Sequence, residues 1–390
     1  MLTLIRNGSV FAPEPLGEKD ILIAGGKIVA VDLPGRVKIG GVPVETLDAS
    51  GKAVGPGLID PHVHILGGGG EGGPATRAPE IRVEDIIASG VTTVIGCLGT
   101  DGTTRHMESL LAKSRALEAE GITTRIFSGS YEVPLKTVTG SLRSDLVLID
   151  KVIGAGEVAI SDHRSSQPTF EEIARLAADC RVGGMLGGKA GVLHLHLGDG
   201  PRRLGLLFRL ADETEIPRTQ VVPTHVNRNP ELFEESLRWA LAGGYIDLTV
   251  GPDPDPGSPE ISVEKAIPLC FERHVPLDRV MISSDSNGSL PVFDRTGKLV
   301  GLTIATERDL LRTFQCVLRL KIVGAEAAFR LFSTNAATFY KLSAKGEIKP
   351  GKDADLTVFD SSWQLREVLA LGRRLMIDGK VAARGTFSPV

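Results

Sequence analysis

Residues 57–74 read GLIDPHVHILGGGGEGGP, an apolar run that carries two histidines one residue apart and then passes into a glycine-rich segment. The chain has only eight histidines, so His62 and His64 form a marked local concentration. Alternate residues of a β-strand point to the same face, so both imidazoles project together. Such a pair can bind one metal ion, although an isolated HxH motif can also be bonded only to backbone groups.

The HxH segment is the first of eight short apolar strands that alternate with helix-like stretches. This alternation is typical of a parallel sheet with crossover helices, and eight units close a TIM-type (β/α)8 barrel. We therefore predict an α/β fold with a barrel domain over residues 55–342. The strands are expected to end near Asp60, Leu98, Tyr131, Ser161, Leu197, His225, Val250 and Asp285.

Both ends of the chain show short β-rich runs separated by turns. LTLIRNGSVF and DILIAGGKIVAVD stand near the start, where Gly25-Gly26 fits a tight hairpin, and KGEIKPGKDADLTVFD stands near the end. We predict that residues 1–54 and 343–390 pair into one small discontinuous β-sandwich domain. A length of 390 residues fits two domains.

The composition indicates a globular protein that acts on a small molecule. The chain has a net charge of -4 and no block of like charges, so neither nucleic acid nor a membrane is expected as a partner. The four cysteines lack CxxC spacing and are expected to be reduced thiols. Without a signal-peptide pattern or an apolar run of about 18 residues, a cytoplasmic location is expected.

Later strand ends supply further candidate metal ligands. The fifth strand closes with HLHLG, the sixth with VVPTHVN and the eighth with MISSDSNGS, which offer His196, His225 and Asp285. Barrel active sites are assembled at this rim, so the sequence predicts a divalent metal centre. Such ligands suit Zn²⁺, although Mn²⁺, Co²⁺ or Fe²⁺ could fill the same set. His194 should lie deeper, in the core or behind the ligands.

This constellation resembles the amidohydrolase superfamily of metal-dependent barrels. Within it, GGGGEGGP, LGTDGTTRH, ISDHRSSQP, PTHVNRNP and SSDSNGSLP are similar to motifs of the isoaspartyl (β-aspartyl) dipeptidases. The resemblance implies two divalent metal ions per chain, a metal-bridging hydroxide as nucleophile, a dipeptide substrate and a homo-oligomer. It also implies metal ligation by His62, His64, His196, His225 and Asp285, and substrate binding by Gly69, Glu71, Thr100, Arg164, Arg228 and Ser289.

The fourth strand departs from the best-known pattern of that superfamily, in which a carbamylated lysine bridges two metals. VIGAGEVAISDHRS places Glu157 there. Because a glutamate is shorter than a lysine carbamate, the strand must approach the metals more closely or one bridge must lengthen. We predict that Glu157 bridges; the alternative is a bond to a neighbouring arginine and a single metal. GAGEVA also matches a dinucleotide fingerprint, but the helix which that site requires does not follow.

Two residues are predicted to be catalytic. Asp285 would accept the proton of the hydroxide and pass it to the departing amine, and Tyr131 would donate its hydroxyl to the oxyanion. Glu71, on a glycine-rich loop over the metals, would pair with a substrate ammonium, while Arg164 and Arg228 would pair with carboxylates. One ammonium and two carboxylates describe an isoaspartyl dipeptide.

Two other functions stay open on the sequence alone. Another amidohydrolase, such as a cyclic-amide hydrolase or an N-acyl amino acid deacylase, would share the metals but would need no partner for an ammonium group. A non-catalytic barrel scaffold would be expected to have lost ligands, whereas all five histidine and aspartate ligands are present.

Overall fold

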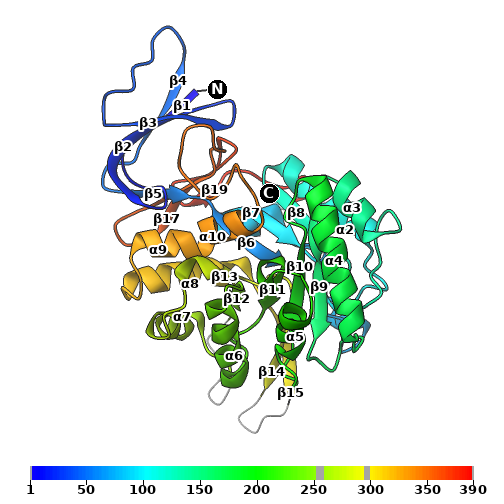
Figure 1. Ribbon diagram of the computed structural model, residues 1–390. Helices are drawn as coiled ribbons and strands as arrows, with labels where there is room; N and C mark the ends of the chain where they lie inside the picture. Colours follow the sequence, from blue (N-terminus) through cyan, green and yellow to red (C-terminus); the bar gives the residue numbers. More distant parts are fainter. Residues whose placement is uncertain (1, 252–258, 294–298, 389–390) are drawn as a thin grey trace.

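The computed structural model describes residues 2–251, 259–293 and 299–388 (Figure 1). Within these ranges, eight parallel strands occur where the sequence predicts them, and each is followed by a helix. The strands are β6 (Leu58–Val63), β7 (Val91–Gly96), β8 (Thr123–Ser128), β9 (Val152–Ile160), β10 (Val192–Leu197), β11 (Val221–Thr224), β12 (Ile246–Thr249) and β13 (Val280–Ser283). The helices are α1 (Val83–Ala88), α2 (Met107–Glu120), α3 (Leu142–Leu148), α4 (Phe170–Gly187), α5 (Gly205–Glu213), α6 (Pro230–Leu241), α7 (Val263–Glu272) and α8 (Glu307–Arg319).

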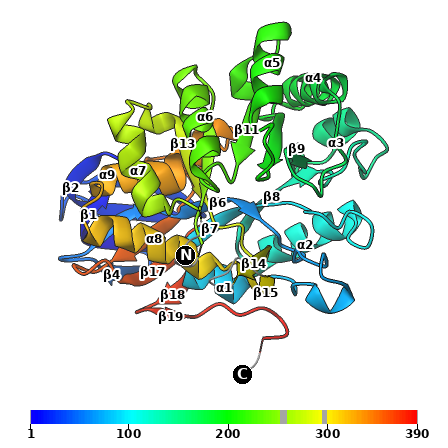
Figure 2. The same cartoon turned by 90° about the horizontal axis from the view of Figure 1, so that it is seen from below.

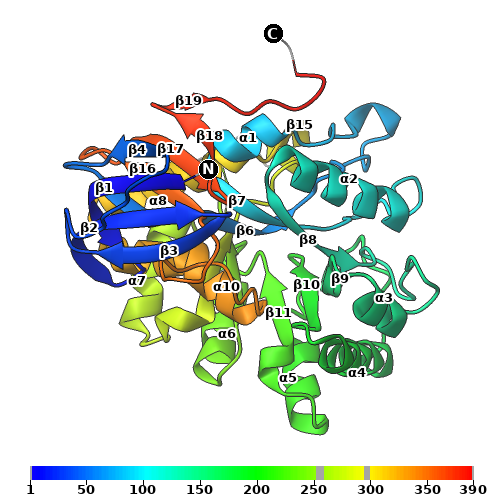
Figure 3. The ribbon, with the colours of Figure 1, turned by 90° about the horizontal axis from the view of Figure 1, so that it is seen from above.

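The eight strands form a curled parallel arrangement. β6 to β11 follow one another in a six-stranded sheet, and β12 pairs in parallel with β13. A parallel bridge between Val63 and Ser286 joins the end of β6 to the segment that follows β13. Helices α2 to α6 lie on the outer side of these strands (Figure 3). This α/β arrangement is consistent with a TIM-type barrel.

Capping residues fix where two of the loops at the carboxyl rim end. Thr169 and Glu172 form a capping box at the start of α4. The Asn229 side chain accepts a hydrogen bond from the Leu232 amide at the start of α6, where Pro230 is the first helical residue. Both arrangements satisfy amide groups that a helix start leaves unpaired. The loops that enter α4 and α6 are therefore held at their far ends.

The two ends of the chain share one nine-stranded sheet. β5 pairs antiparallel with β16, so that Val54 lies opposite Val358. Gly25 and Gly26, with φ of 57° and 78°, form the predicted tight turn between β2 and β3. Figure 2 shows this sheet beside α8 and α9, away from α4 and α5. Its strands are β1 (Leu2–Phe11), β2 (Pro15–Ala24), β3 (Lys27–Asp32), β4 (Val44–Asp48), β5 (Ala53–Pro56), β16 (Leu356–Phe359), β17 (Leu365–Ala370), β18 (Arg373–Ile377) and β19 (Lys380–Val381).

The remaining elements connect these two sets of strands. Between β13 and α8, the antiparallel strands β14 and β15 form a hairpin that the sequence analysis did not predict. No helix in the described part of the chain is both long enough and apolar enough to cross a membrane. The connecting elements are β14 (Ser289–Phe293), β15 (Leu299–Ile304), α9 (Ala325–Phe329), a π-helical turn (Arg330–Thr334), α10 (Asn335–Phe339) and 3-10 turns at Pro74–Thr76, Arg218–Gln220 and Leu277–Arg279.

Candidate metal centre

Six side chains converge toward the carboxyl ends of five parallel strands. Three of them lie in β6, β9 and β10, and the other three lie within two residues of the ends of β6, β11 and β13. All six are buried. The structure therefore brings together every residue that the sequence predicted as a metal ligand: His62, His64, Glu157, His196, His225 and Asp285.

Glu157 lies at the middle of this group. Its Oε2 atom is 3.0 Å from His196 Nδ1 and 3.5 Å from both His62 Nε2 and His225 Nε2. Its Oε1 atom is 3.4 Å from His64 Nε2. One carboxylate thus faces histidines from three different strands, which is the position that a bridging ligand requires.

Asp285 contacts the two histidines of the HxH motif. Its Oδ1 atom is 3.0 Å from His64 Nε2 and 3.4 Å from His62 Nε2. Burial alone would raise the pKa of Asp285, but its contacts with His62 and His64 hold it well below its usual value. The carboxyl group is therefore ionised and can act as a ligand.

Several buried atoms of this group have no hydrogen-bond partner among the described residues. Burial lowers the pKa of His225 to about 3, so its imidazole is neutral and keeps a free lone pair. Buried polar atoms without partners are costly, and imidazole nitrogen with carboxylate oxygen is a donor set that divalent metals prefer. The residues present therefore fit a divalent metal centre. Within the described ranges, the atoms without a hydrogen-bond partner include His62 Nε2, Glu157 Oε1, His225 Nε2 and Asp285 Oδ1.

A bulge in β9 carries Glu157 to this position. Leu193 of β10 pairs with Ala155, whereas Leu195 pairs with Val158, so β9 holds one more residue than β10 over this stretch. An extra residue bends a strand and re-aims a side chain. A glutamate is shorter than a lysine carbamate, so a bridging glutamate needs its strand to approach the metals more closely. The bulge is a local distortion of β9 that re-aims the Glu157 side chain.

Polar side chains behind the centre orient its histidines. His194 Nε2 lies 2.7 Å from His62 Nδ1, and Thr249 Oγ1 lies 2.7 Å from His225 Nδ1. The Tyr340 hydroxyl in turn lies 3.2 Å from His194 Nδ1. Such contacts fix which ring nitrogen faces a metal. His194 thus occupies the supporting position that the sequence predicted for it.

Asp162 is a site residue that the sequence analysis missed. Its Oδ2 atom lies 3.0 Å from His196 Nε2, and its carboxylate accepts hydrogen bonds from Arg164 Nε at 3.0 Å and Nη2 at 2.7 Å. Arg228 Nη1 is 4.0 Å away. Asp162 therefore joins a candidate metal ligand to both candidate carboxylate-binding arginines. Its place in ISDHRS, directly after β9, was the signal that could have revealed it.

Glu71 lies among the other predicted substrate-binding residues. Thr100 Oγ1 donates a hydrogen bond to Glu71 Oε1 at 2.8 Å, and Ser289 Oγ donates to Oε2 at 3.2 Å. Arg164 Nη1 is 3.4 Å from Oε1. Gly69 approaches Ser289 so closely that a Cβ atom on it would lie 3.2 Å from the Ser289 Cβ. These five residues form one polar group beside the metal centre.

Tyr131 links that polar group to the histidines. Its hydroxyl lies 2.8 Å from His196 Nδ1, and the Arg164 guanidinium lies 5.5 Å from the centre of its ring. Burial, with Glu157 nearby, raises the pKa of Tyr131 well above its usual value. The hydroxyl therefore stays protonated and can donate a hydrogen bond.

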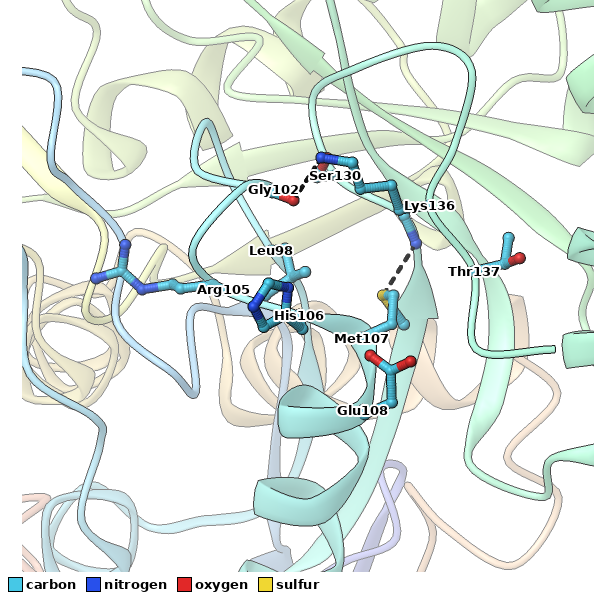
Figure 4. A pocket seen from close by; sticks show the side chains of 10 residues that line it. Leu98, Gly102, Arg105, His106, Met107, Glu108, Ser130, Lys136 and Thr137 are labelled. Carbon is cyan, nitrogen blue, oxygen red and sulfur yellow. Dashed lines mark hydrogen bonds between the residues drawn. The ribbon is translucent and has the colours of Figure 1, made fainter. Parts of the chain in front are cut away.

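A cavity of about 220 Å³ lies between the loops that follow β7 and β8 (Figure 4). Its lining includes Leu98, Arg105 and Ser130 but none of the six converging side chains. Figure 4 shows Lys136 reaching across to the Gly102 carbonyl, at 2.9 Å. This bond ties the loop that carries Thr100 to the loop that follows Tyr131.

The chain is similar to known proteins over nearly its whole length. The amidohydrolase family model matches residues 266–382. A β-aspartyl dipeptidase from Fervidobacterium islandicum AW-1, solved in complex with the dipeptide β-Asp-Leu, is 47% identical, with a TM-score of 0.92 over 98% of this chain and 97% of that chain. A second β-aspartyl dipeptidase structure from that organism is 45% identical, with a TM-score of 0.89 over 98% of both chains. A dihydroorotase from Lactobacillus gasseri is 24% identical over 92% of this chain and 89% of its own length. The chain therefore belongs to the amidohydrolase superfamily, and within it to the family of the β-aspartyl dipeptidases.

Proposed function

We propose that this protein hydrolyses β-aspartyl (isoaspartyl) dipeptides in a metal-dependent reaction. The observation that carries the proposal is the placement of Glu71 and Arg164, one acidic and one basic group, beside the cluster of candidate metal ligands. The relative that is 47% identical was solved with β-Asp-Leu bound, which supports the same substrate class here.

The six converging residues would hold two divalent metal ions per chain, with Glu157 between them and zinc as the expected ion. When bound, such ions lower the pKa of a water molecule toward neutrality and polarise a carbonyl group. Glu157→Gln should weaken metal retention, because the amide loses the negative charge that faces four histidines. Added bicarbonate should change nothing, and rescue by bicarbonate would point instead to a carbamylated lysine.

Two side chains would handle protons and charge during the reaction. Asp285, ionised and next to His64, would accept a proton from the attacking water and deliver it to the departing amine. Tyr131, whose hydroxyl stays protonated, would donate a hydrogen bond to the oxygen that becomes negative.

The polar group beside the metals would recognise the ends of the dipeptide. Glu71 would pair with the α-ammonium group of the substrate. Thr100, Ser289 and Gly69 would position the Glu71 carboxylate and the loop that carries it. Arg164 and Arg228 would pair with the two carboxylates, for which planar guanidinium groups are well suited.

The test compares β-Asp-Leu with α-Asp-Leu during a metal titration. The proposal expects cleavage of the β-linked dipeptide, with activity that rises as the second metal ion per chain is added. Equal cleavage of both dipeptides would contradict the specificity, and full activity with one metal per chain would contradict the two-metal centre.

A second candidate is another amidohydrolase activity, on cyclic amides or N-acyl amino acids. The match to a dihydroorotase over most of both chains supports this candidate. Glu71→Gln separates the two, because it should disable a dipeptidase that binds an ammonium group and spare an enzyme whose substrate has none. A non-catalytic scaffold, the third alternative, would purify without stoichiometric metal.

We also propose that the eight parallel strands close into a complete (β/α)8 barrel over residues 55–342. Residues 1–54 and 343–390 would form the separate β-sandwich domain. The shared nine-stranded sheet supports this division, since β5 and β16 pair across the two chain ends. The homo-oligomeric state and the cytoplasmic location stay predictions.

A further inference from the structure

The sequence analysis assigned no role to Cys97, which lies beside the metal centre. It directly follows β7 and is 1% exposed. Its Sγ atom lies 3.9 Å from His64 Nδ1 and 3.7 Å from the Val63 carbonyl oxygen. Both contacts are long, so the thiol is not committed to a strong hydrogen bond.

Cys97 completes a group of four potential ligand atoms. One atom from each of His62, His64, Cys97 and Glu157 lies within 4.8 Å of every other. Neighbouring ligands of a tetrahedral zinc ion stand roughly 3.5 Å apart, as follows from zinc–nitrogen and zinc–sulfur bonds of about 2.0 and 2.3 Å. The limit of 4.8 Å exceeds this spacing by about 1.3 Å, so binding of the ion would draw the four atoms together.

Two other members of this group also point to a ligand. His62 Nε2 and Glu157 Oε1 are buried, and neither has a hydrogen-bond partner among the residues that the structure describes. The side chains of His62 and Glu157 are 0% and 1% exposed. A buried thiol next to two unpartnered donor atoms is the environment of a ligand rather than that of a packing residue.

We propose that Cys97 is a thiolate ligand of the divalent ion held by His62 and His64, beside Glu157. This inference rests on the metal centre of the proposed function. Binding would form a metal–sulfur bond and break the S–H bond, with the proton released to solvent. A thiolate is a soft ligand, so this position would favour Zn²⁺ or Co²⁺ over Mg²⁺ and Mn²⁺.

X-ray absorption at the zinc edge of the zinc-loaded full chain tests the proposal without any variant. A scattering path at a zinc–sulfur distance of about 2.3 Å is expected. A first shell of nitrogen and oxygen alone, in protein that holds its full complement of zinc, would overturn it.

Two variants identify the sulfur. Cys97→Ser should lose the zinc–sulfur path, and its cobalt-loaded form should lose the thiolate-to-cobalt charge-transfer absorption in the near ultraviolet. Cys270→Ser is the matched control, because Cys270 is also a buried free thiol but lies in α7. Retention of the path in Cys97→Ser, or its loss in Cys270→Ser, would contradict the assignment.

The outcomes separate this inference from the proposed function. Wild-type protein that cleaves β-Asp-Leu but shows no zinc–sulfur path would refute the thiolate ligand and leave the dipeptidase intact. A zinc–sulfur path in protein without any dipeptidase activity would support the thiolate ligand and refute the dipeptidase function.

Discussion

Asp162 shows how much a single side chain can hold in place. It contacts the candidate metal ligand His196 and the candidate carboxylate-binding residue Arg164. Burial alone would raise the pKa of Asp162, but hydrogen bonds from these two residues keep it well below its usual value. The carboxylate therefore stays charged and orients both groups.

Asp162→Asn should impair metal binding and substrate binding together. The amide keeps the shape of the side chain but loses the charge, so metal affinity should fall by about 10–100-fold, as for other groups that orient a ligand. The KM for β-Asp-Leu should rise because Arg164 loses its anchor. Chelator competition and steady-state kinetics measure the two effects.

Asp179→Asn is the control for Asp162→Asn. Asp179 also pairs with an arginine, Arg143, at 2.7 Å, but on the outer helices α3 and α4. This variant should keep its metal affinity and its KM. Equal metal loss in both variants would show that the effect is a general loss of stability.

Individual residues differ in how far the sequence could predict them. The convergence of the candidate ligands His62, His64 and Asp285 was predictable because strand ends must meet at one rim. Asp162 and Cys97 were not, since their contacts depend on how a loop and a neighbouring strand pack, which no spacing in the chain fixes. The motif around Asp162 was visible, but its partner His196 lies 34 residues away.

At the scale of elements, the bulge in β9 depends on Gly156. Its φ is 153°, and a Cβ atom there would lie 2.8 Å from the His194 carbonyl oxygen of β10. A side chain at this position would therefore push apart the two strands that carry Glu157 and His196.

Gly156→Ala should destabilise the fold by about 1–3 kcal/mol, the usual cost of overpacking a closely packed interior. It should also release metal more readily, since Glu157 moves with the bulge. Urea unfolding and metal analysis are the measurements. Gly205→Ala is the control, because nothing lies within 4 Å of a Cβ atom there. Equal unfolding midpoints for the two variants would contradict the role of the bulge.

The glycine-rich loop that carries Glu71 is held by a buried arginine. Arg105 donates hydrogen bonds to the carbonyl oxygens of Gly68 at 2.8 Å and Gly69 at 3.2 Å. Asp101 accepts from Arg105 at 3.2 Å and from Arg77, at the end of the loop, at 2.5 Å. Glycines do not restrict the conformation of this loop, so the hydrogen bonds of Arg105 and Asp101 fix it.

Stability should depend on pH through Asp101. Burial alone would raise the pKa of Asp101, but hydrogen bonds from Thr104 and Arg77 lower it well below its usual value. A carboxylate whose folded pKa is depressed stabilises the fold above its unfolded pKa of about 3.9, and this contribution is lost as the pH falls through the folded pKa.

Asp101→Asn should therefore lower the free energy of unfolding most at neutral pH, and the difference from wild type should shrink below about pH 4. Urea unfolding at a series of pH values measures it. Asp150→Asn should show little difference at any pH, because Asp150 is 72% exposed and 3.8 Å from Arg115. A deficit for Asp101→Asn that grows as the pH falls would contradict the argument.

At the scale of the whole molecule, the order of elements was predictable and some connections were not. Eight apolar strands with helices after them fix the parallel topology, because each crossover returns the chain to the same sheet edge. The hairpin of β14 and β15 was missed although SLPVF and LVGLTI have strand-like composition.

Lys345 joins the two sets of strands. Its Nζ atom lies 2.6 Å from Asp355, 2.9 Å from Asp353 and 2.6 Å from the Thr123 hydroxyl at the start of β8. Lys345 is 7% exposed, and the two aspartates directly precede β16 of the terminal sheet. The ammonium group therefore pairs with two acids where the terminal sheet meets the parallel strands, and Lys27 also pairs with Asp353.

Lys345→Met should lower the free energy of unfolding by about 3–5 kcal/mol, because it leaves the buried Asp355 carboxylate without its cationic partner. Thermal and urea unfolding measure this loss. Lys113→Met, which removes a pair at 3.2 Å from the exposed Glu80, should cost less than about 1 kcal/mol. Since Lys345 contacts none of the candidate metal ligands, folded Lys345→Met protein should keep the metal affinity of the wild type. Equal stability of the two variants would mean that packing alone, and not this buried charge, holds the terminal sheet to the parallel strands.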